Sequence, residues 1–148
     1  MPPGQPELTS EHAYRAFMIV QLLRSTGEKE FPAPLMACFF WIAAHNGCRQ
    51  EDLKSACQMS ASSVSRNVTW LGPRHRLGHR SGLRLVRRER DPDNPKAWRL
   101  YLTPKGRVFT NLLENYQEAP IRDDNPIYNQ ALKEITDYDN EPDDQDVG

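Results

Sequence analysis

The sequence lacks any apolar run that approaches the roughly 20 residues a helix needs to cross a membrane. Its first six residues lack the basic and apolar regions of a secretory signal peptide. It has three cysteines, Cys38, Cys48 and Cys57, an odd number without the spacing of a metal site, which fits a reducing compartment. We therefore expect no membrane partner and a cytoplasmic location, in a bacterium or, for a virus-encoded protein, in its host cell.

Patterns typical of catalysis are also absent. The sequence has no glycine-rich phosphate loop and no arrangement typical of a catalytic triad or of paired acid–base carboxylates. Its four histidines are too scattered for a metal site, and the Asp pairs at 123–124 and 143–144 lie in acidic sequence near the C-terminus. We therefore expect no enzyme activity, no catalytic residue, no metal and no cofactor.

Charge is distributed unevenly along the 148 residues, although the net charge is only −1. Residues 1–122 contain 18 Lys and Arg against 11 Asp and Glu, whereas residues 123–148 contain one Lys against nine Asp and Glu. Residues 66–107 alone contain 12 basic and three acidic residues. A basic segment within a near-neutral chain indicates a polyanionic partner, with an ordinary solvated face as the alternative.

Composition divides the chain into four parts. Residues 1–8 are proline-rich and predicted to be disordered, and residues 9–122 form the predicted folded domain. A short helix is predicted within residues 123–138, and residues 139–148 form an acidic tail predicted to be disordered. The tail either folds over the basic segment and competes with its partner or serves only solubility.

Two helices are predicted before the basic segment. Thr9 or Ser10 caps the first helix, and Gly27 ends it. Pro34 suits the first turn of the second helix, which is apolar almost all round to residue 44 and is terminated by Asn46-Gly47. A helix without a polar face is predicted to lie at the centre of the domain.

A helix-turn-helix pattern follows. A short helix over residues 50–57 directs Leu53 and Ala56 inward, and Ser60 caps a helix from Ala61 to about Leu71. In that second helix the core-facing residues recur at helical spacing: Val64, Val68 and Leu71. Its other face is small and polar near the N-terminus and basic in the middle, as suits a helix lying in a DNA major groove, although an ordinary serine-rich surface helix is the alternative. The residues expected to contact DNA from it are Ser60, Ser62, Ser63, Ser65, Arg66 and Asn67.

A basic hairpin comes next. Residues 83–90 and 97–103 are predicted as its strands, joined by turn residues at 91–95. We expect it to contact DNA through Arg88, Arg90, Lys96 and Arg99. The preceding loop is expected to contact the DNA backbone through Arg74, Arg76, Arg80 and Arg84. A last helix is predicted from Pro104 to about Glu118, with an apolar stripe of either Val108, Leu112 and Tyr116 or Phe109, Leu112 and Leu113.

The order and spacing of these pieces resemble the MarR family of winged-helix transcription regulators. The likeness covers about residues 31–118, and its main pieces are Ser62-Ser63-Val64-Ser65-Arg66, Asp91-Pro92-Asp93 and Leu102-Thr103-Pro104-Lys105-Gly106. It implies a mainly α fold with a small β-hairpin wing (α+β), flanked by N- and C-terminal dimerisation helices. It also implies a homodimer that binds a pseudo-palindromic site in double-stranded DNA and regulates transcription, with a repressor as the expected type. The family's Asp-x-Arg at the wing tip is replaced here by Asn94-Pro95-Lys96.

Alternatives remain open for two residues and for the function. Arg66 either reads guanine with two hydrogen bonds or contacts phosphate. Cys48 lies beside Arg49, which would lower the thiol pKa and make Cys48 a candidate redox switch, with an inert thiol as the alternative. The alternative functions are a winged-helix protein-interaction or assembly module and a DNA-organising or segregation adaptor without a role in transcription. A small-molecule effector is compatible with a regulator, but the sequence does not identify one.

Overall fold

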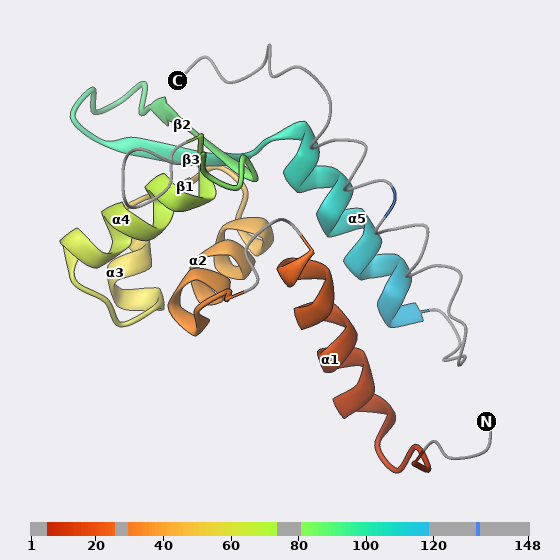
Figure 1. Cartoon of the computed structure of the whole chain (residues 1–148). Coiled ribbons are helices and arrows are strands. Elements are labelled where there is room, and N and C mark those ends of the chain that lie inside the picture. The colour runs from red at the N-terminus through yellow and green to blue at the C-terminus, as the bar shows by residue number, and fades with distance from the viewer. Residues whose placement is uncertain (1–5, 26–29, 74–80, 119–132, 134–148) are drawn as a thin grey trace.

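The computed structural model describes residues 6–25, 30–73, 81–118 and 133. In chain order the elements are α1 (Glu11–Arg24), α2 (Ala33–Ala44), β1 (Cys48–Arg49), α3 (Asp52–Ala56), α4 (Ala61–Leu71), β2 (Val86–Arg90), β3 (Trp98–Leu102) and α5 (Pro104–Glu118). Figure 1 shows α1 and α5 side by side, with α2, α3, α4 and the sheet beside them. The predicted mainly α fold with a β-hairpin is confirmed. The expected DNA contacts Arg74, Arg76 and Arg80, the acidic tail and, apart from Lys133, the predicted helix within 123–138 lie outside the described residues.

Short polar side chains set the starts of three helices. The Ser10 hydroxyl accepts a hydrogen bond from the backbone N–H of Ala13 at 3.2 Å, and the Ser60 hydroxyl accepts one from Ser63 at 3.1 Å. At α5, the Thr103 hydroxyl accepts from the N–H of Gly106 at 3.0 Å and donates to the Arg84 carbonyl at 2.6 Å. The N–H groups of Ala13, Ser63 and Gly106 are among those that a helix itself leaves unpaired, so each hydroxyl satisfies one of them. The N-caps predicted at the first and fourth helices are therefore confirmed.

The apolar helix α2 lies at the centre of the core, as predicted. Its Leu35, Phe39 and Ile42 are fully buried. The rings of Phe39 and of Phe109 from α5 pack edge to face, with 5.5 Å between centroids. Together with buried residues of the other elements, these side chains form one continuous hydrophobic cluster. The core therefore joins the helix-turn-helix to α1 and α5.

Burial decides between the sequence alternatives for two helices. On α5 the stripe is the second alternative, with Phe109, Leu112 and Leu113 buried. On α3 the prediction for Ala56 is wrong, because that residue is exposed. The helix has only five residues, and in it only Leu53 is buried. One turn of helix can direct only one such side chain into the core.

The sheet has three antiparallel strands in the order β1-β3-β2. In the hairpin, Val86 pairs with Leu102 and Arg88 with Leu100. The sequence did not predict β1, whose two residues pair with β3 on its other edge. Gly47 makes the turn into it with a positive φ of 90°. A two-residue strand has no detectable alternation, so only its partner strand defines it.

The end of α4 determines where the hairpin begins. The predicted first strand over residues 83–90 starts only at Val86. The backbone N–H groups before it donate instead to carbonyls at the end of α4, from Leu83 to Trp70 at 2.8 Å and from Leu85 to Leu71 at 2.8 Å. The last carbonyls of a helix have no partner within it, so this segment satisfies them. The hairpin is thereby attached directly to the C-terminal end of α4.

Candidate nucleic-acid interface

Helix α4 has one buried face and one exposed face, because its apolar residues recur every three to four positions. Val64 and Val68 are each only 1% exposed, whereas Arg66 is exposed and its guanidinium has no partner in the described part of the chain. The predicted contact residues fall into two groups. Ser60, Ser62 and Ser65 are exposed like Arg66, whereas Ser63 and Asn67 are half-buried. The Asn67 amide donates to the Ser63 carbonyl at 3.0 Å, so this side chain lies against its own helix.

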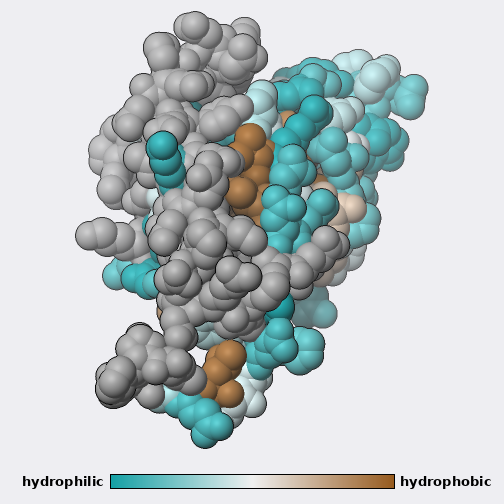
Figure 2. Space-filling model, turned by 90° about the vertical axis from the view of Figure 1, so that its right-hand side faces the viewer, coloured by the Kyte–Doolittle hydropathy of each residue, from teal (hydrophilic) through white to brown (hydrophobic). Residues whose placement is uncertain are grey.

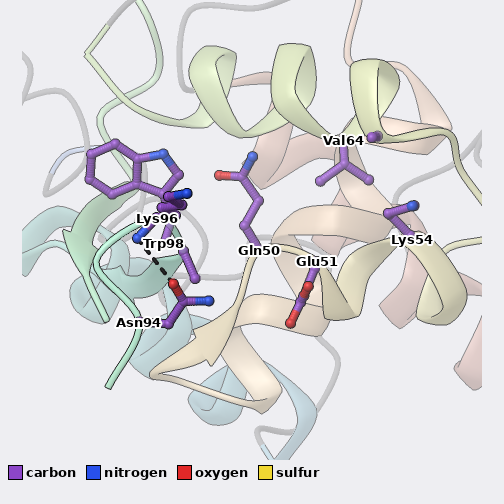
Figure 3. A pocket seen from close by; sticks show the side chains of 9 residues that line it. Gln50, Glu51, Lys54, Val64, Asn94, Lys96 and Trp98 are labelled. Carbon is purple, nitrogen blue, oxygen red and sulfur yellow. Dashed lines mark hydrogen bonds between the residues drawn. The ribbon is translucent and has the colours of Figure 1, made fainter. Parts of the chain in front are cut away.

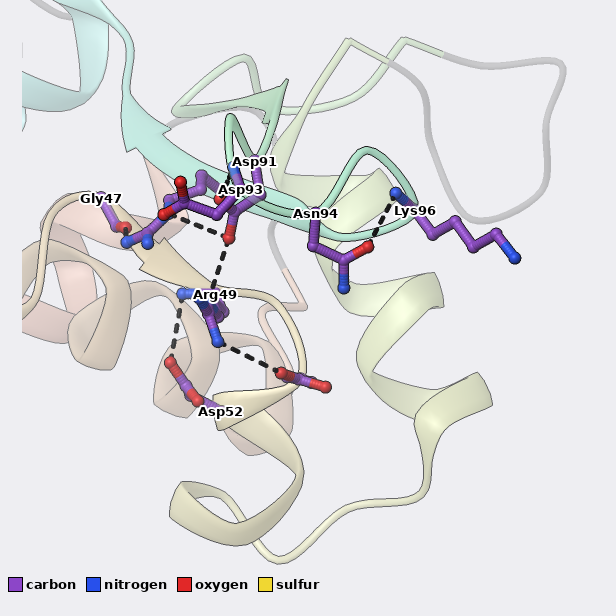
Figure 4. A network of polar contacts seen from close by, with 9 residues as sticks. Gly47, Arg49, Asp52, Asp91, Asp93, Asn94 and Lys96 are labelled. Atoms are coloured by element: carbon purple, nitrogen blue, oxygen red, sulfur yellow. Dashed lines mark hydrogen bonds and ion pairs between the residues drawn. The ribbon is translucent and has the colours of Figure 1, made fainter.

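The cations predicted to contact DNA from the hairpin have different surroundings. Arg90 lies over the ring of Trp98, 3.8 Å from its centroid, and donates to the Pro95 carbonyl at 3.1 Å. Arg99 donates to the Gly47 carbonyl at 3.0 Å. Lys96 is exposed, and Figure 4 shows its side chain extending away from the polar network at the hairpin tip.

Two other predicted contacts, Arg88 and Arg84, are half-buried. The guanidinium of Arg88 is turned toward α4 and makes three hydrogen bonds there and to Gln50. Arg84 is half-buried with a left-handed backbone, φ 59°. In the hairpin, Lys96 is therefore the predicted contact whose charged group is most freely presented to a partner.

Asp91 holds the hairpin tip to the rest of the sheet (Figure 4). Its side chain is fully buried and accepts from the Arg49 Nε at 3.0 Å, with the Arg99 Nε 3.3 Å away. Its other oxygen accepts from the backbone N–H of Asp93 at 2.9 Å. This N–H and the two guanidinium groups lower the pKa of Asp91, although burial acts in the opposite direction. The sequence prediction identified the turn but not this ion-pair network.

We expect stability to depend on the charge of Asp91. Because its pKa is lowered by folding, the ionised carboxylate stabilises the fold above the unfolded-state pKa of about 3.9, and the contribution is lost as pH falls through the folded-state pKa. Asp91→Asn should therefore lower the Tm at pH 7, and its difference from wild type should shrink below about pH 4. Thermal unfolding across pH measures this, with Asp93→Asn at an exposed site of the same turn as the control. A difference that stays constant down to about pH 2 would contradict the linkage.

Helix α3, the turn that includes Gln58 with φ 54°, and α4 form a helix-turn-helix. The β2–β3 hairpin follows α4 in the chain, begins at the end of that helix and is hydrogen-bonded to its side through Arg88. The fold is a winged helix-turn-helix. In this winged helix the hairpin is the wing, α4 occupies the position of the recognition helix, and β1 adds a third strand to the wing sheet.

Solved structures similar to this winged helix are MarR-family transcription regulators, as the sequence predicted. One is a MarR transcriptional regulator from Methanosarcina mazei, with 16% identity, a TM-score of 0.47, and coverage of 86% of this chain and 84% of that one. Another is PcaV from Streptomyces coelicolor, with 21% identity, a TM-score of 0.45, and coverage of 88% and 98%. A third is BpsR from Bordetella bronchiseptica, whose DNA binding is regulated by 6-hydroxynicotinic acid, with 16% identity, a TM-score of 0.44, and coverage of 94% and 100%. No protein-family model matches the sequence, and no curated protein matches it.

A cavity of about 260 Å³ lies between α3, the recognition helix and the wing tip (Figure 3). Its lining includes the apolar residues Val64 and Trp98 and three charged ones, Lys54, Lys96 and Glu51. Both lysines are exposed, and neither amine has a partner among residues 6–25, 30–73 and 81–118. The sequence prediction did not include Lys54, because one lysine on a short helix carries no pattern. The fold brings it near the wing tip, which adds a cation to the candidate interface.

The expectation that Arg49 lowers the pKa of Cys48 is wrong. Burial, followed by the nearby Asp52 carboxylate, raises the pKa of Cys48 to about 11. The Arg49 guanidinium binds Asp91 instead. Burial likewise raises the pKa of Cys38 to about 12. Because the reactive species is the thiolate, we propose no redox role for Cys48.

Two other features concern the described ranges as a whole. None of the helices there combines the length and apolar character required to cross a membrane. In the same ranges, no three His, Cys, Asp or Glu side chains lie together as potential metal ligands.

Proposed function

We propose that this chain is a sequence-specific, double-stranded-DNA-binding transcriptional regulator that acts as a homodimeric repressor. The observation that supports this most directly is the exposed polar face of α4, with the wing beside it and Arg66 at its middle, unpaired among the residues that the structure describes. An α-helix fits the B-DNA major groove, where base edges carry a distinct pattern of donors and acceptors. A helix whose opposite face is buried in a core can enter the groove at a defined angle.

The charges around this face suit a phosphate backbone. The N-terminus of α4 carries exposed Ser62 and Ser65, and helix N-termini favour anions through their N–H groups and dipole. Lys54 and Lys96 lie on either side of the cavity beside this end of the helix. Such contacts would position the protein, whereas base discrimination would come from Arg66.

We propose that α1 provides the dimer contact, because it has a second apolar face. Its buried face includes Met18, Leu22 and Leu23. Four further residues, spaced i, i+3, i+4 and i+7, are exposed on another face: Ala13, Ala16, Phe17 and Val20. Phe17 is 53% and Val20 36% exposed. Figure 2 shows the side of the molecule toward which α1 and α5 lie, where hydrophobic surface is visible between hydrophilic residues. A second copy would cover this stripe isologously, as two-fold symmetry requires.

Footprinting of genomic fragments at physiological salt tests the function. A regulator should protect a discrete site with two half-sites about 34 Å apart. Long cooperative coverage would instead identify a DNA-organising adaptor. Binding no tighter than about 10⁻⁵ M without sequence preference would identify a protein-interaction module. Either of these results would overturn the proposed regulator.

Arg66→Ala should weaken specific binding. A lost guanine contact should cost about 1–3 kcal/mol in each half-site and relax the preference at one base pair. A lost phosphate contact should weaken binding to all sequences equally and reduce the log–log salt slope by about 0.9 for each subunit. Competition gel shifts at several salt concentrations distinguish the two. Arg107→Ala, which removes the same charge from an exposed site on α5, is the control, and equal behaviour of the two variants would exclude Arg66 from the interface.

A further inference from the structure

Arg88 is an arginine of the wing strand β2 that is turned toward the recognition helix. We propose that it is a positioning residue, which holds the wing at a fixed distance from α4, and that it does not contact DNA. This role rests on the proposed DNA-binding function, because it concerns how the two reading elements are placed relative to each other.

The contacts of Arg88 connect three parts of the winged helix. Its Nε donates to the Oε1 of Gln50 at 3.0 Å, just before α3. Its Nη2 donates to the carbonyl of Ser65 at 3.2 Å and to the hydroxyl of Thr69 at 3.2 Å, both on α4. Because these two acceptors lie one helical turn apart, the contacts fix both the distance between α4 and the wing and the position of the wing along the α4 axis. The rigid, planar fork of a guanidinium can satisfy such a set, whereas a lysine amine cannot reproduce its geometry.

The surroundings of Arg88 also make a phosphate contact costly. The three acceptors are neutral, and the side chain is half-buried beside Trp98, whose ring centroid is 5.9 Å from the guanidinium carbon. Reaching outward to a phosphate would break hydrogen bonds that the burial makes hard to replace. Lys96 on the same wing is exposed, and its amine has no partner among the described residues that an anion would have to displace.

This arrangement predicts a particular effect on recognition. Ser65, whose carbonyl accepts from Arg88, directly precedes Arg66, the residue expected to reach a base. Loosening the contact lets α4 and the wing move relative to each other. Binding that requires both elements in one register is then weakened, whereas sequence-independent phosphate binding tolerates the movement.

The experiment compares Arg88→Lys and Arg88→Met with Lys96→Met, using an operator fragment and a non-specific duplex of equal length. Both Arg88 variants should lose operator affinity by about tenfold, as expected for misplaced base contacts. They should change non-specific affinity less than about twofold and leave the salt slope unchanged, because no phosphate contact is lost. Lys96→Met should reduce the slope on both duplexes by about 0.9 for each wing. The inference would be overturned if Arg88→Lys bound both duplexes like wild type while Arg88→Met reduced the log–log salt slope on both. That result would identify Arg88 as a phosphate contact.

A double-mutant cycle with Thr69→Val tests the contact without changing charge. As a single variant, Thr69→Val should weaken operator binding. In the Arg88→Met background it should have little further effect, because the same contact is already lost. Additive effects on operator affinity would overturn the inference. The same four proteins are also compared by their Tm without DNA, and that measurement tests the contact independently of the proposed function. If wild type binds no DNA, the proposed function fails and the positioning role in recognition fails with it, whereas additive Tm changes would show that the contact itself is absent.

Discussion

Gly106→Ala is expected to lower the free energy of unfolding by about 3 kcal/mol, at the upper end of the cost of overpacking a core. Gly106 lies in the first turn of α5, within the Leu-Thr-Pro-Lys-Gly sequence that closes the wing. A Cβ added there would lie 2.2 Å from the carbonyl oxygen of Leu85, a separation that real Cβ atoms do not tolerate. Leu85 is fully buried, and its carbonyl also accepts from the N–H of Thr103 at 3.1 Å, so it cannot yield without losing that bond.

The sign of this effect distinguishes tertiary packing from helix propensity. In an exposed helix, replacing glycine with alanine stabilises by about 1 kcal/mol. Denaturant unfolding of Gly106→Ala measures the net result, and Gly72→Ala is a matched control. At Gly72 an added Cβ would lie 3.4 Å or more from its neighbours, so a change below about 1 kcal/mol is expected there. A Gly106→Ala variant as stable as wild type would contradict the close approach of α5 to Leu85.

Phe17→Glu is expected to convert the proposed dimer to a monomer and to weaken operator binding by about 100-fold or more. Phe17 is 53% exposed, so a charge there should cost the folded subunit little, whereas it would have to be buried at the centre of the stripe on α1 when two copies meet. Each subunit would then bind a half-site alone and lose the advantage of linked binding.

Light scattering for mass and gel shifts for affinity measure the two parts of this result. Circular dichroism should show an unchanged fold. Phe17→Leu keeps an apolar side chain at the same site and should remain dimeric with wild-type affinity. The dimer contact proposed on α1 would be wrong if Phe17→Glu remained a dimer of undiminished affinity, and the homodimer itself would be wrong if wild type were monomeric.

The starts of helices and the buried face of α4 could be predicted from the sequence because their causes are local. Ser10 and Ser60 accept hydrogen bonds from residues three positions away. Val64 and Val68 are one helical turn apart, and that spacing alone places them on one face. The resemblance of residues 31–118 to a winged helix combines such local patterns in a fixed order, and the fold confirmed it.

The candidate site was predicted less completely. The exposed face with Ser62, Ser65 and Arg66 agrees with the helical spacing, and Lys96 is exposed as a turn residue should be. The actual surroundings of Arg88 could not be predicted, because its acceptors on α4 are 19 and 23 residues away in the sequence.

The sequence by itself determined the order of helices and hairpin, the polar face of the recognition helix and the basic character of the segment around it. These properties depend on spacing and composition over a few residues, and neither changes when the chain folds. Only the tertiary structure decided that β1 joins the wing sheet and that Asp91 forms ion pairs with two arginines. It also decided that burial raises the pKa of Cys48 and that Gly106 has no room for a side chain. Each of these depends on groups far apart in the chain that meet only when the core has formed.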